Sequence, residues 1–474
     1  MAPAGSLLQL LDLPPDVLVS ILSRLPFNER LRLSGVCRRL RQLCAGPSQL
    51  WRCVDVRRRL ESGPEETKLQ LIGRSMQLQR GLGEWLAPRA AAVEELSLAL
   101  QMQLLSANQL VPAVVVPQPS GLPALHQLTI EWPGTAMWTT AARPWPELLP
   151  ALTKLDFGLG TQLCLENQGL SILPSLREFS LSNGTLELSA CLSPWLPDTV
   201  TSLWLSAAGI RGIPATVTHL TRLRSLVVGM NRFGTGQKDS LDLLPPLGGT
   251  LEELNLSETC LRAFPTQVSA LTRLKVLYLH NAWHRSAALI PSDWDALQPL
   301  ATSLRFLSIS GNRLEALPFA VLGMPRLLGL HVEDNDLAGP LPLAPYLRTL
   351  RELLLDWQAA LDSHEALRAA TSLSRLVLSG HRAVDLHPDG TLTVRPAQSA
   401  EPLLAALAAM PALRLVEDIQ GEEDVVTAPV AHAMWQMGRR LGPQVALGAA
   451  KDSNLGWTLT EVEAAEAAEA AQQA

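Results

Sequence analysis

A pattern of the form apolar-x-x-apolar-x-apolar recurs along most of this chain of 474 residues and constrains its fold more than any other feature. Successive copies start 23 to 32 residues apart, and the last three steps are 23 residues each. Alternating apolar residues in a short strand turn one row of side chains to the same side. The chain is therefore expected to stack one such strand per repeat. The copies start at Val93, Leu125, Leu152, Leu176, Val200, Leu223, Leu251, Leu274, Leu304, Leu327, Leu350 and Leu373.

A period of about 20 to 29 residues with this pattern is the signature of leucine-rich repeats. A second apolar run closes each coil, and the apolar faces stay uncovered until a neighbour stacks on them. We therefore predict an α/β fold, a leucine-rich-repeat solenoid in the form of a horseshoe, with a parallel β-ladder on its concave face and about 12 repeats over residues 93–416. A helical solenoid is the weaker alternative, because proline and glycine interrupt nearly every unit.

Asparagine follows the strand in the clearest repeats. Asn312 and Asn335 are placed where the chain leaves the ladder, so their amides are expected to bond backbone groups at the turn. Asn231 is a third candidate, whereas Thr259 occupies the same place in another repeat. Several coils are therefore degenerate.

A block of about 40 residues in front of the repeats has helical periodicity and is too small to hold a large core. Its apolar stripes are too wide for such a bundle to bury alone, and an exposed apolar surface usually marks a partner site. The alternative is a helical cap on the repeats. The first stripe comprises Val17, Leu18, Ile21, Leu22 and Leu25.

This block resembles an F-box in the order and spacing of four motifs. They are Leu13-Pro14-x-Asp16-x-Leu18, Ile21-Leu22-Ser23-x-Leu25-Pro26, Val36-Cys37-Arg38-Arg39-Leu40 and Pro47-x-x-Leu50-Trp51. The block departs from the family in two respects: Leu40 stands where many F-boxes have tryptophan, and Glu29-Arg30 replaces a common acidic-leucine pair.

F-boxes bind the Skp-type adaptor of cullin–RING ubiquitin ligases, so the resemblance implies such a partner here. Val36, Cys37 and Trp51 are candidates for either adaptor contact or internal packing. The residues that the resemblance assigns to adaptor contact are Leu13, Pro14, Leu18, Ile21, Leu22 and Leu25.

The remaining boundaries follow from composition. Residues 461–474 consist almost wholly of alanine, glutamate and glutamine, so we expect no core-forming residue there and a disordered or frayed helical tail. The predicted organisation is a tail at 1–10, an F-box at 11–56, a linker with an N-terminal cap helix at 57–92, repeats at 93–416, a C-terminal cap at 417–460 and the tail at 461–474.

Charge and cysteine usage limit the partners. Residues 1–60 carry ten arginines and four acidic residues (+6), and the other residues carry 29 basic and 41 acidic side chains (−12). No aromatic residues interleave with the arginine cluster, so we expect no nucleic-acid partner. No apolar run reaches 18 residues and no secretory signal is evident, which argues against a membrane. The six cysteines lack C-x-x-C spacing, which favours reduced thiols in the cytoplasm or nucleus.

Catalytic motifs are absent from the sequence. There is no G-x-x-x-x-G-K phosphate loop, no G-x-G-x-x-G after a strand and no H-E-x-x-H. His280 and His284 are spaced i, i+4 but lack a third ligand nearby in sequence, and Ser363-His364-Glu365 is a lone triplet. We therefore predict no enzyme, no catalytic residue, no metal and no cofactor.

The concave face of the predicted ladder holds the candidate target site. Residues that flank the inward leucines point outward, and four successive strands bring exposed aromatic residues together within a polar rim, as a binding hot spot requires. The alternative is that this face merely tolerates aromatic residues. The predicted site comprises Val276, Tyr278, His280, Phe306, His331, Glu333 and Asp356, with Trp204 standing apart.

Two functions remain open at this point. In the first, the F-box docks a Skp-type adaptor and through it a cullin–RING ligase, while the repeats bind an unknown protein for ubiquitination and the chain stays monomeric within the complex. In the second, the chain is a scaffold unconnected to ubiquitin, and the N-terminal block is only a cap. Accessibility of the face that bears Leu18 and Ile21 discriminates between them.

Overall fold

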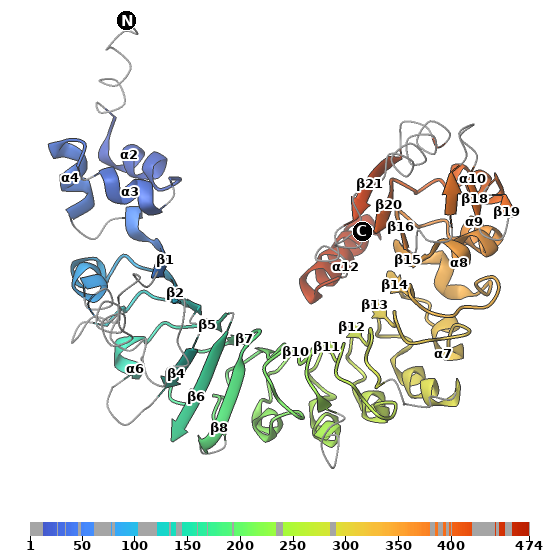
Figure 1. Ribbon diagram of the computed structural model, residues 1–474, viewed down its shortest axis with the longest axis horizontal. Coiled ribbons are helices and arrows are strands. Elements are labelled where there is room, and N and C mark those ends of the chain that lie inside the picture. The colour runs from blue at the N-terminus through green and yellow to red at the C-terminus, as the bar shows by residue number, and fades with distance from the viewer. Residues whose placement is uncertain are drawn as a thin grey trace, which may run out of the picture. The chain divides into compact units, whose positions relative to one another are not determined.

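The computed structural model describes two compact units (Figure 1). The N-terminal unit comprises Met1–Ile210 and Pro214–Leu223, and the C-terminal unit comprises Arg211–Ile213 and Arg224–Ala474. The predicted tail at 1–10 and most of the helix expected within 57–92 lie outside the described residues. The described residues are 13–25, 27–33, 35–45, 49–60, 77, 81–102, 121–131, 134–138, 145–158, 160–167, 169–191, 194–233, 240–284, 291–379, 384–386, 392–394, 398–399, 401–419, 441, 445–450 and 457–473.

The N-terminal unit begins with the predicted helical block. Helix α2 starts at Pro15 with Asp16 in its first turn, where a missing N–H is harmless and a negative charge is favourable. Its core is formed by Leu18, Leu50 and Trp51, all of them buried. The elements are α2 (Pro15–Leu22), α3 (Phe27–Leu33), α4 (Arg38–Ala45) and the 3-10 turn η1 (Gln49–Trp51).

A parallel ladder follows in the same unit. Strand β1 pairs with β2 from Cys53 opposite Glu95 to Leu60 opposite Met102. The repeat pattern does not predict β1, which covers the first repeat and straddles the predicted boundary at 56. The ladder order is β1 (Cys53–Leu60), β2 (Glu95–Met102), β3 (Gln127–Glu131), β5 (Lys154–Phe157), β7 (Glu178–Leu181) and β9 (Ser202–Trp204); a second sheet holds β4 (Gly134–Trp138), β6 (Thr161–Asn167) and β8 (Thr185–Cys191).

The C-terminal unit continues with parallel pairing between successive repeats. Its ladder also takes in β20, which begins at the end of the predicted repeat region, and β21, which lies within the predicted C-terminal cap. The order is β10 (Ser225–Val227), β11 (Glu253–Asn255), β12 (Val276–Tyr278), β13 (Phe306–Ser308), β14 (Gly329–His331), β15 (Glu352–Asp356), β16 (Arg375–Ser379), β20 (Leu415–Ile419) and β21 (Ala446–Ala450); β17 (Val384–Leu386), β18 (Leu392–Val394) and β19 (Gln398–Ser399) form a small antiparallel sheet.

Short helices and 3-10 turns form the return segments of the repeats. Most begin at or directly after a proline, whose fixed φ suits the start of a helix. They are η2 (Ala87–Arg89), α6 (Trp145–Leu148), η4 (Ala215–His219), η6 (Ser240–Leu243), η7 (Pro245–Leu247), η8 (Thr266–Ala270), η9 (Pro291–Leu300), α7 (Phe319–Leu322), η10 (Pro345–Arg348), α8 (Trp357–Asp362), α9 (His364–Ala369) and α10 (Glu401–Ala408).

The predicted leucine-rich-repeat fold is confirmed. A strand begins two residues after each of the twelve predicted starting positions. The strand therefore has the same position within every repeat, which we call the phase of the repeat. In the C-terminal unit this phase places one buried leucine of each strand opposite that of the next. These leucines are Leu226, Leu254, Leu277, Leu307, Leu330, Leu353 and Leu376.

Asparagines close the turns after the strands as predicted. The Asn312 amide donates to the carbonyls of Leu279 (2.8 Å) and Ile309 (2.9 Å). The Asn335 side-chain oxygen accepts from the backbone N–H groups of Asn312 (2.9 Å) and Leu314 (3.0 Å). One repeat is thereby bonded to the next where the strand pairing ends.

The C-terminal segment is a capped helix rather than a disordered or frayed tail. Helix α12 spans Leu459–Gln473. Thr458 and Glu461 form a reciprocal capping box: Glu461 accepts from the Thr458 backbone N–H (2.7 Å), and the Thr458 hydroxyl accepts from the Glu461 N–H (3.3 Å). The expectation of no core-forming residue is wrong, because Val462 is fully buried. Alanine, the best helix former, fills much of the rest.

The shared row of buried leucines generates the first prediction. Leu307→Ala is expected to cost about 2–5 kcal/mol of local stability, because it removes apolar contacts to two neighbouring strands and leaves a cavity. Urea denaturation followed by circular dichroism measures the loss. Leu343→Ala, at a leucine that is 67% exposed, is the matched control. Equal denaturation midpoints for the two variants would contradict the prediction.

Candidate protein-interaction surfaces

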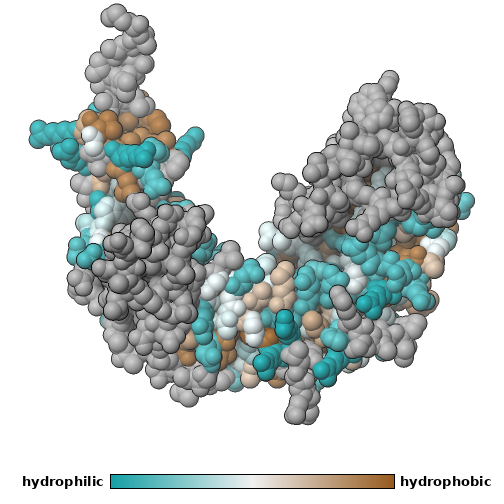
Figure 2. Space-filling model, viewed as in Figure 1, coloured by the Kyte–Doolittle hydropathy of each residue, from teal (hydrophilic) through white to brown (hydrophobic). Residues whose placement is uncertain are grey.

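The helical block exposes an apolar stripe, which we call the block stripe. Val17 and Ile21 are one helical turn apart on α2, and Leu25 follows the end of that helix. Ile21 is 42% and Val36 is 66% exposed. Figure 2 shows hydrophobic residues gathered on this block. Exposed apolar side chains at this density on a small bundle favour a partner that covers them.

The structure divides the six predicted adaptor contacts. Leu18 is 0% exposed and Leu22 is nearly buried, so both pack inside the block and stabilise it. Pro14, Ile21 and Leu25 are exposed, and Leu13 is intermediate. Only the exposed members are therefore accessible to a partner, whereas Leu18 and Leu22 stabilise the fold of the block. The block stripe comprises Val17, Ile21, Leu25 and Val36.

Arg30 explains one departure from the F-box pattern. Its guanidinium is buried and donates to the carbonyls of Leu50 (2.5 Å) and Cys53 (2.8 Å). A buried charge needs such partners, because an unpaired one costs several kcal/mol. Arg30 thereby joins α3 to the turn that leads into β1.

Arg89 makes a second connection between the block and the first coil. It donates to the carbonyls of Trp85 (2.6 Å) and Cys44 at the end of α4 (2.8 Å). Its guanidinium carbon lies 4.2 Å from the centroid of the Trp85 ring, and Trp85 packs edge-on against Trp51 at 5.0 Å. Trp51 is therefore internal packing, and the block is joined firmly to the ladder.

The predicted target site forms a cluster on the ladder face of the C-terminal unit, the side of the strands away from the inward leucines. The rings of Tyr278 and Phe306 are 4.9 Å apart, and those of Phe306 and His331 are 4.8 Å apart. The expected closeness is therefore confirmed for these residues. Their expected exposure is wrong for Val276, Phe306 and His331, which are buried.

Helix α12 covers this cluster. Val462 packs with Val276 and Phe306 in one buried group, against which Tyr278 and Trp457 also pack. The Tyr278 hydroxyl donates to the Trp457 carbonyl (2.9 Å), and burial raises the pKa of Tyr278. We call Val276, Tyr278 and Phe306 the apolar patch.

Gly329 leaves the space that this arrangement needs. A Cβ atom at this position would lie 2.6 Å from Phe306 Cδ2 and 3.5 Å from Trp457 Nε1. Any side chain on β14 here would therefore displace the phenylalanine ring, so the glycine is required by close packing rather than by backbone conformation.

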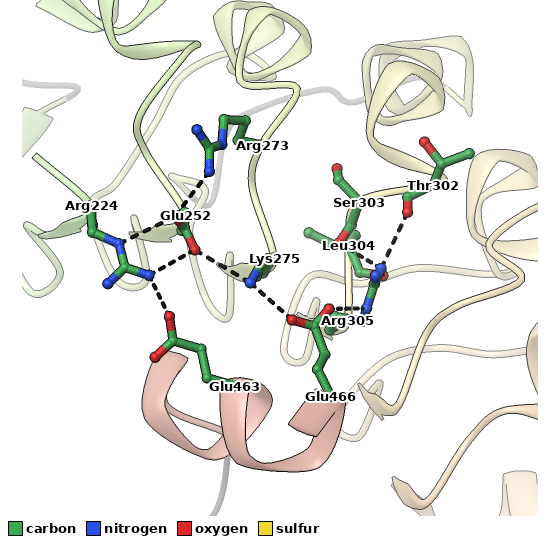
Figure 3. A network of polar contacts seen from close by, with 10 residues as sticks. All are labelled: Arg224, Glu252, Arg273, Lys275, Thr302, Ser303, Leu304, Arg305, Glu463 and Glu466. Carbon is green, nitrogen blue, oxygen red and sulfur yellow. Dashed lines mark hydrogen bonds and ion pairs between the residues drawn. The ribbon is translucent and has the colours of Figure 1, made fainter. Parts of the chain in front are cut away.

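Charged residues directly before four successive strands form a row along the ladder (Figure 3). Glu466 of α12 contacts Lys275 Nζ (2.9 Å) and Arg305 Nε (2.9 Å), and Glu463 pairs with Arg224. Burial opposes ionisation of Glu466, but Lys275 and Arg305 lower its pKa below the usual value. We call Arg224, Lys275 and Arg305 the basic row.

Glu252 holds the basic row together from within the ladder. It is buried and receives Arg224 at 3.1 Å and Lys275 at 3.4 Å. Burial alone would raise its pKa, but hydrogen bonds and charges from these two cations lower it. The row has three cations for one buried carboxylate, so it presents net positive charge to α12.

A second charged network fixes His331. Its Nε2 lies 2.7 Å from Glu352, which also accepts from Arg375 (2.9 Å), and Arg375 reaches Glu417 (2.6 Å). Burial opposes ionisation of Glu352, but His331 and Arg375 lower its pKa. These side chains satisfy one another, so His331 serves the ladder rather than an open surface.

The other predicted site residues are more scattered. His280 lies 3.2 Å from Glu258, and Asp356 accepts from the Asp334 N–H (3.1 Å). Trp204 is exposed and belongs to the N-terminal unit. Among these residues the pKa of Glu333 is shifted furthest from its usual value. Burial raises it to about 7, although the charge of His331 opposes the shift.

Sequence reasoning missed the basic row and its acidic partner. The available signal was a charged residue at the second position of consecutive repeats, together with two glutamates spaced i, i+3 in the C-terminal segment. No three His, Cys, Asp or Glu side chains gather as a metal site would require in the part of the chain that the structure describes. None of the described helices combines the length and apolarity needed to cross a bilayer.

Comparison with known proteins finds similarities to both parts of the chain. An F-box-like family model matches residues 10–57. The human protein "Leucine-rich repeats and immunoglobulin-like domains protein 3" is 28% identical over 193 residues, which is 40% of this chain and only 14% of that relative. A leucine-rich-repeat protein of Leptospira interrogans is 17% identical, with a TM-score of 0.36, over 65% of this chain and 92% of its own. The TLR13–ssRNA13 complex is 18% identical, with a TM-score of 0.43, over 74% and 54%.

Glu333 generates a prediction about pH. Its carboxyl binds a proton more tightly in the folded state, so wild-type stability falls as the pH rises from about 4.5 to about 7. Glu333→Gln is expected to raise the free energy of unfolding at pH 8 by about 1–3 kcal/mol, at roughly 1.4 kcal/mol per pKa unit, and much less at pH 4.5. Urea denaturation at both pH values measures the difference.

The control for that experiment is Asp336→Asn, which removes the same charge from an exposed neighbour. The prediction fails if Glu333→Gln changes the free energy of unfolding equally at both pH values, or by no more than Asp336→Asn does. Either result would show that the Glu333 carboxylate is well solvated.

Proposed function

We propose that this chain is the substrate-recognition subunit of a Skp–cullin–F-box ubiquitin ligase. The proposal starts from its F-box-like segment and its leucine-rich-repeat ladder. The helical block would dock a Skp-type adaptor, and the repeats would bind the protein to be ubiquitinated. Ubiquitin transfer would belong to the partner complex, so the chain itself is not proposed to be an enzyme.

The observation that carries the proposal is the block stripe. Four apolar side chains are exposed inside the segment that matches the F-box-like model. Covering such solvent-exposed apolar residues with a partner removes apolar surface from water, which stabilises the complex. A Skp-type adaptor bound to the block stripe would supply that cover.

The connection between block and ladder supports the same function. Arg30 and Arg89 join the block to the first coil through buried and partly buried hydrogen bonds, so a docked adaptor would be held in a fixed relation to the neighbouring strands. A ligase receptor needs such rigidity, because the target must stay within reach of the transferring subunit. The described free thiols, among them Cys44 and Cys260, suit a reducing cytoplasm or nucleus.

The same connection also favours a second candidate, a repeat scaffold unconnected to ubiquitin. Trp51 and Arg89 close the end of the ladder as a cap would. In that case the block stripe would bind some other protein, and a Skp-type adaptor would not be retained.

The third prediction tests adaptor docking. Ile21→Asp is expected to weaken binding to a purified Skp-type adaptor at least a hundredfold, because it places a charge at the centre of the block stripe without entering the core. Isothermal titration calorimetry measures the affinity, and circular dichroism checks the fold. Leu18→Asp is unsuitable, because Leu18 lies inside the block.

The matched control is Phe319→Asp, which places the same charge at a highly exposed apolar residue outside the block. It should bind the adaptor as wild type does. A folded wild-type protein that shows no affinity for the adaptor would refute the ligase assignment in favour of the scaffold.

A further inference from the structure

Helix α12 contacts the ladder in the way that a bound peptide contacts a receptor. The ladder strands pair with one another through their backbones. The bonds from α12 and its cap to the ladder instead use ladder side chains, at Arg224, Lys275, Tyr278 and Arg305. The repeats therefore complete their backbone pairing without α12.

The covered surface has the composition of a binding hot spot. Its centre is the apolar patch, with Val276 and Phe306 fully buried beneath Val462. Its edge is the basic row, whose Lys275 and Arg305 are mostly buried by α12 and by the ladder. Aromatic and arginine side chains beside a desolvated apolar centre contribute most of the affinity at protein interfaces.

We infer that the apolar patch and the basic row together form a binding site for an acidic amphipathic helix, which we call the helix site. In this structure α12 occupies it from within the same chain. A target would present a helix of the same chemistry and replace α12. This inference rests on the proposed function only where it identifies the incoming helix as a ubiquitination target; binding of the helix is independent of it.

The contacts of α12 define the chemistry of that partner. Trp457 precedes the capping residue Thr458, and Val462 is the fourth helical residue, so the two occupy the positions of a hydrophobic staple, and both pack against the apolar patch. Glu463 and Glu466, one turn apart, reach the basic row. The partner is therefore a helix with an aromatic residue before a capped first turn. It carries one inward aliphatic residue, and acidic residues on the adjoining face.

Because α12 occupies the helix site, it determines how high the affinity of a competing target must be. A tethered segment competes at an effective concentration of about millimolar, so a separate helix at micromolar concentration is largely excluded while α12 is bound. Weakening α12 should therefore raise the apparent affinity for the same sequence added as a peptide, without any change in the helix site itself.

The experiment uses the full chain and a fluorescein-labelled peptide of residues 457–473. The variant Glu463→Lys/Glu466→Lys weakens α12 through two partly exposed side chains and leaves the ladder unchanged. Fluorescence anisotropy should show that this variant binds the peptide at least tenfold more tightly than wild type. A peptide that carries Glu466→Lys should lose at least tenfold in affinity for the same variant.

A second variant pair separates release of the helix from damage to the fold. Val462→Asp removes the inward residue of α12, whereas Ala468→Asp adds the same carboxylate at an exposed position of that helix. Val462→Asp should bind the peptide like the double lysine variant, and Ala468→Asp should behave like wild type. Circular dichroism melts establish that each variant is folded.

Two results would overturn the inference: no peptide binding by the folded lysine variant, or equal binding by that variant and wild type. Both are distinguishable from failure of the ligase proposal. Ile21→Asp should leave peptide binding by the lysine variant unchanged, and the lysine variant should leave adaptor binding unchanged. Loss of adaptor binding alone would therefore remove the ligase assignment and leave the helix site standing.

Discussion

The constant phase of the inward leucines is the constraint on which the rest of the structure depends. Because Leu254, Leu277 and Leu307 lie opposite one another in paired strands, every other position of the repeat also lines up across strands. The residues that precede successive strands therefore form one row, and the first residues of those strands form another. Lys275 and Arg305 thus become neighbours although they are 30 residues apart, and the helix site is a consequence of that register.

The features that depend on local periodicity could be predicted from the sequence. Twelve strands, the turn-closing bonds of Asn312 and Asn335, and the closeness of Tyr278 to Phe306 all follow from one repeated pattern. Strand β1 could not be found in the same way, since it lacks the full repeat and gains its partner only when the ladder forms. In α2 the apolar stripe was visible, but the packing of Leu18, rather than Ile21, against the rest of the block was not.

The covering of the candidate site could not be predicted, because it depends on contacts between distant parts of the chain. Tyr278 and Trp457 are 179 residues apart, and Lys275 and Glu466 are 191 apart. The segment 461–474 contains one aliphatic residue larger than alanine, so its composition alone resembles a solvated tail. What makes Val462 a core residue is the apolar patch on the ladder, together with a capping box that fixes the helix from which it projects.

Electrostatics add a condition on any helix that replaces α12. Residues 61–474 carry a net charge of −12, so a strongly acidic partner approaches this part of the chain against its overall charge. At physiological ionic strength that repulsion is screened beyond about 8 Å, whereas the basic row acts within contact distance. A helix with its acids confined to one face gains the local attraction with little of the long-range penalty. The helix site therefore selects the distribution of charge on its partner as well as its sign, and α12, already tethered, avoids the approach altogether.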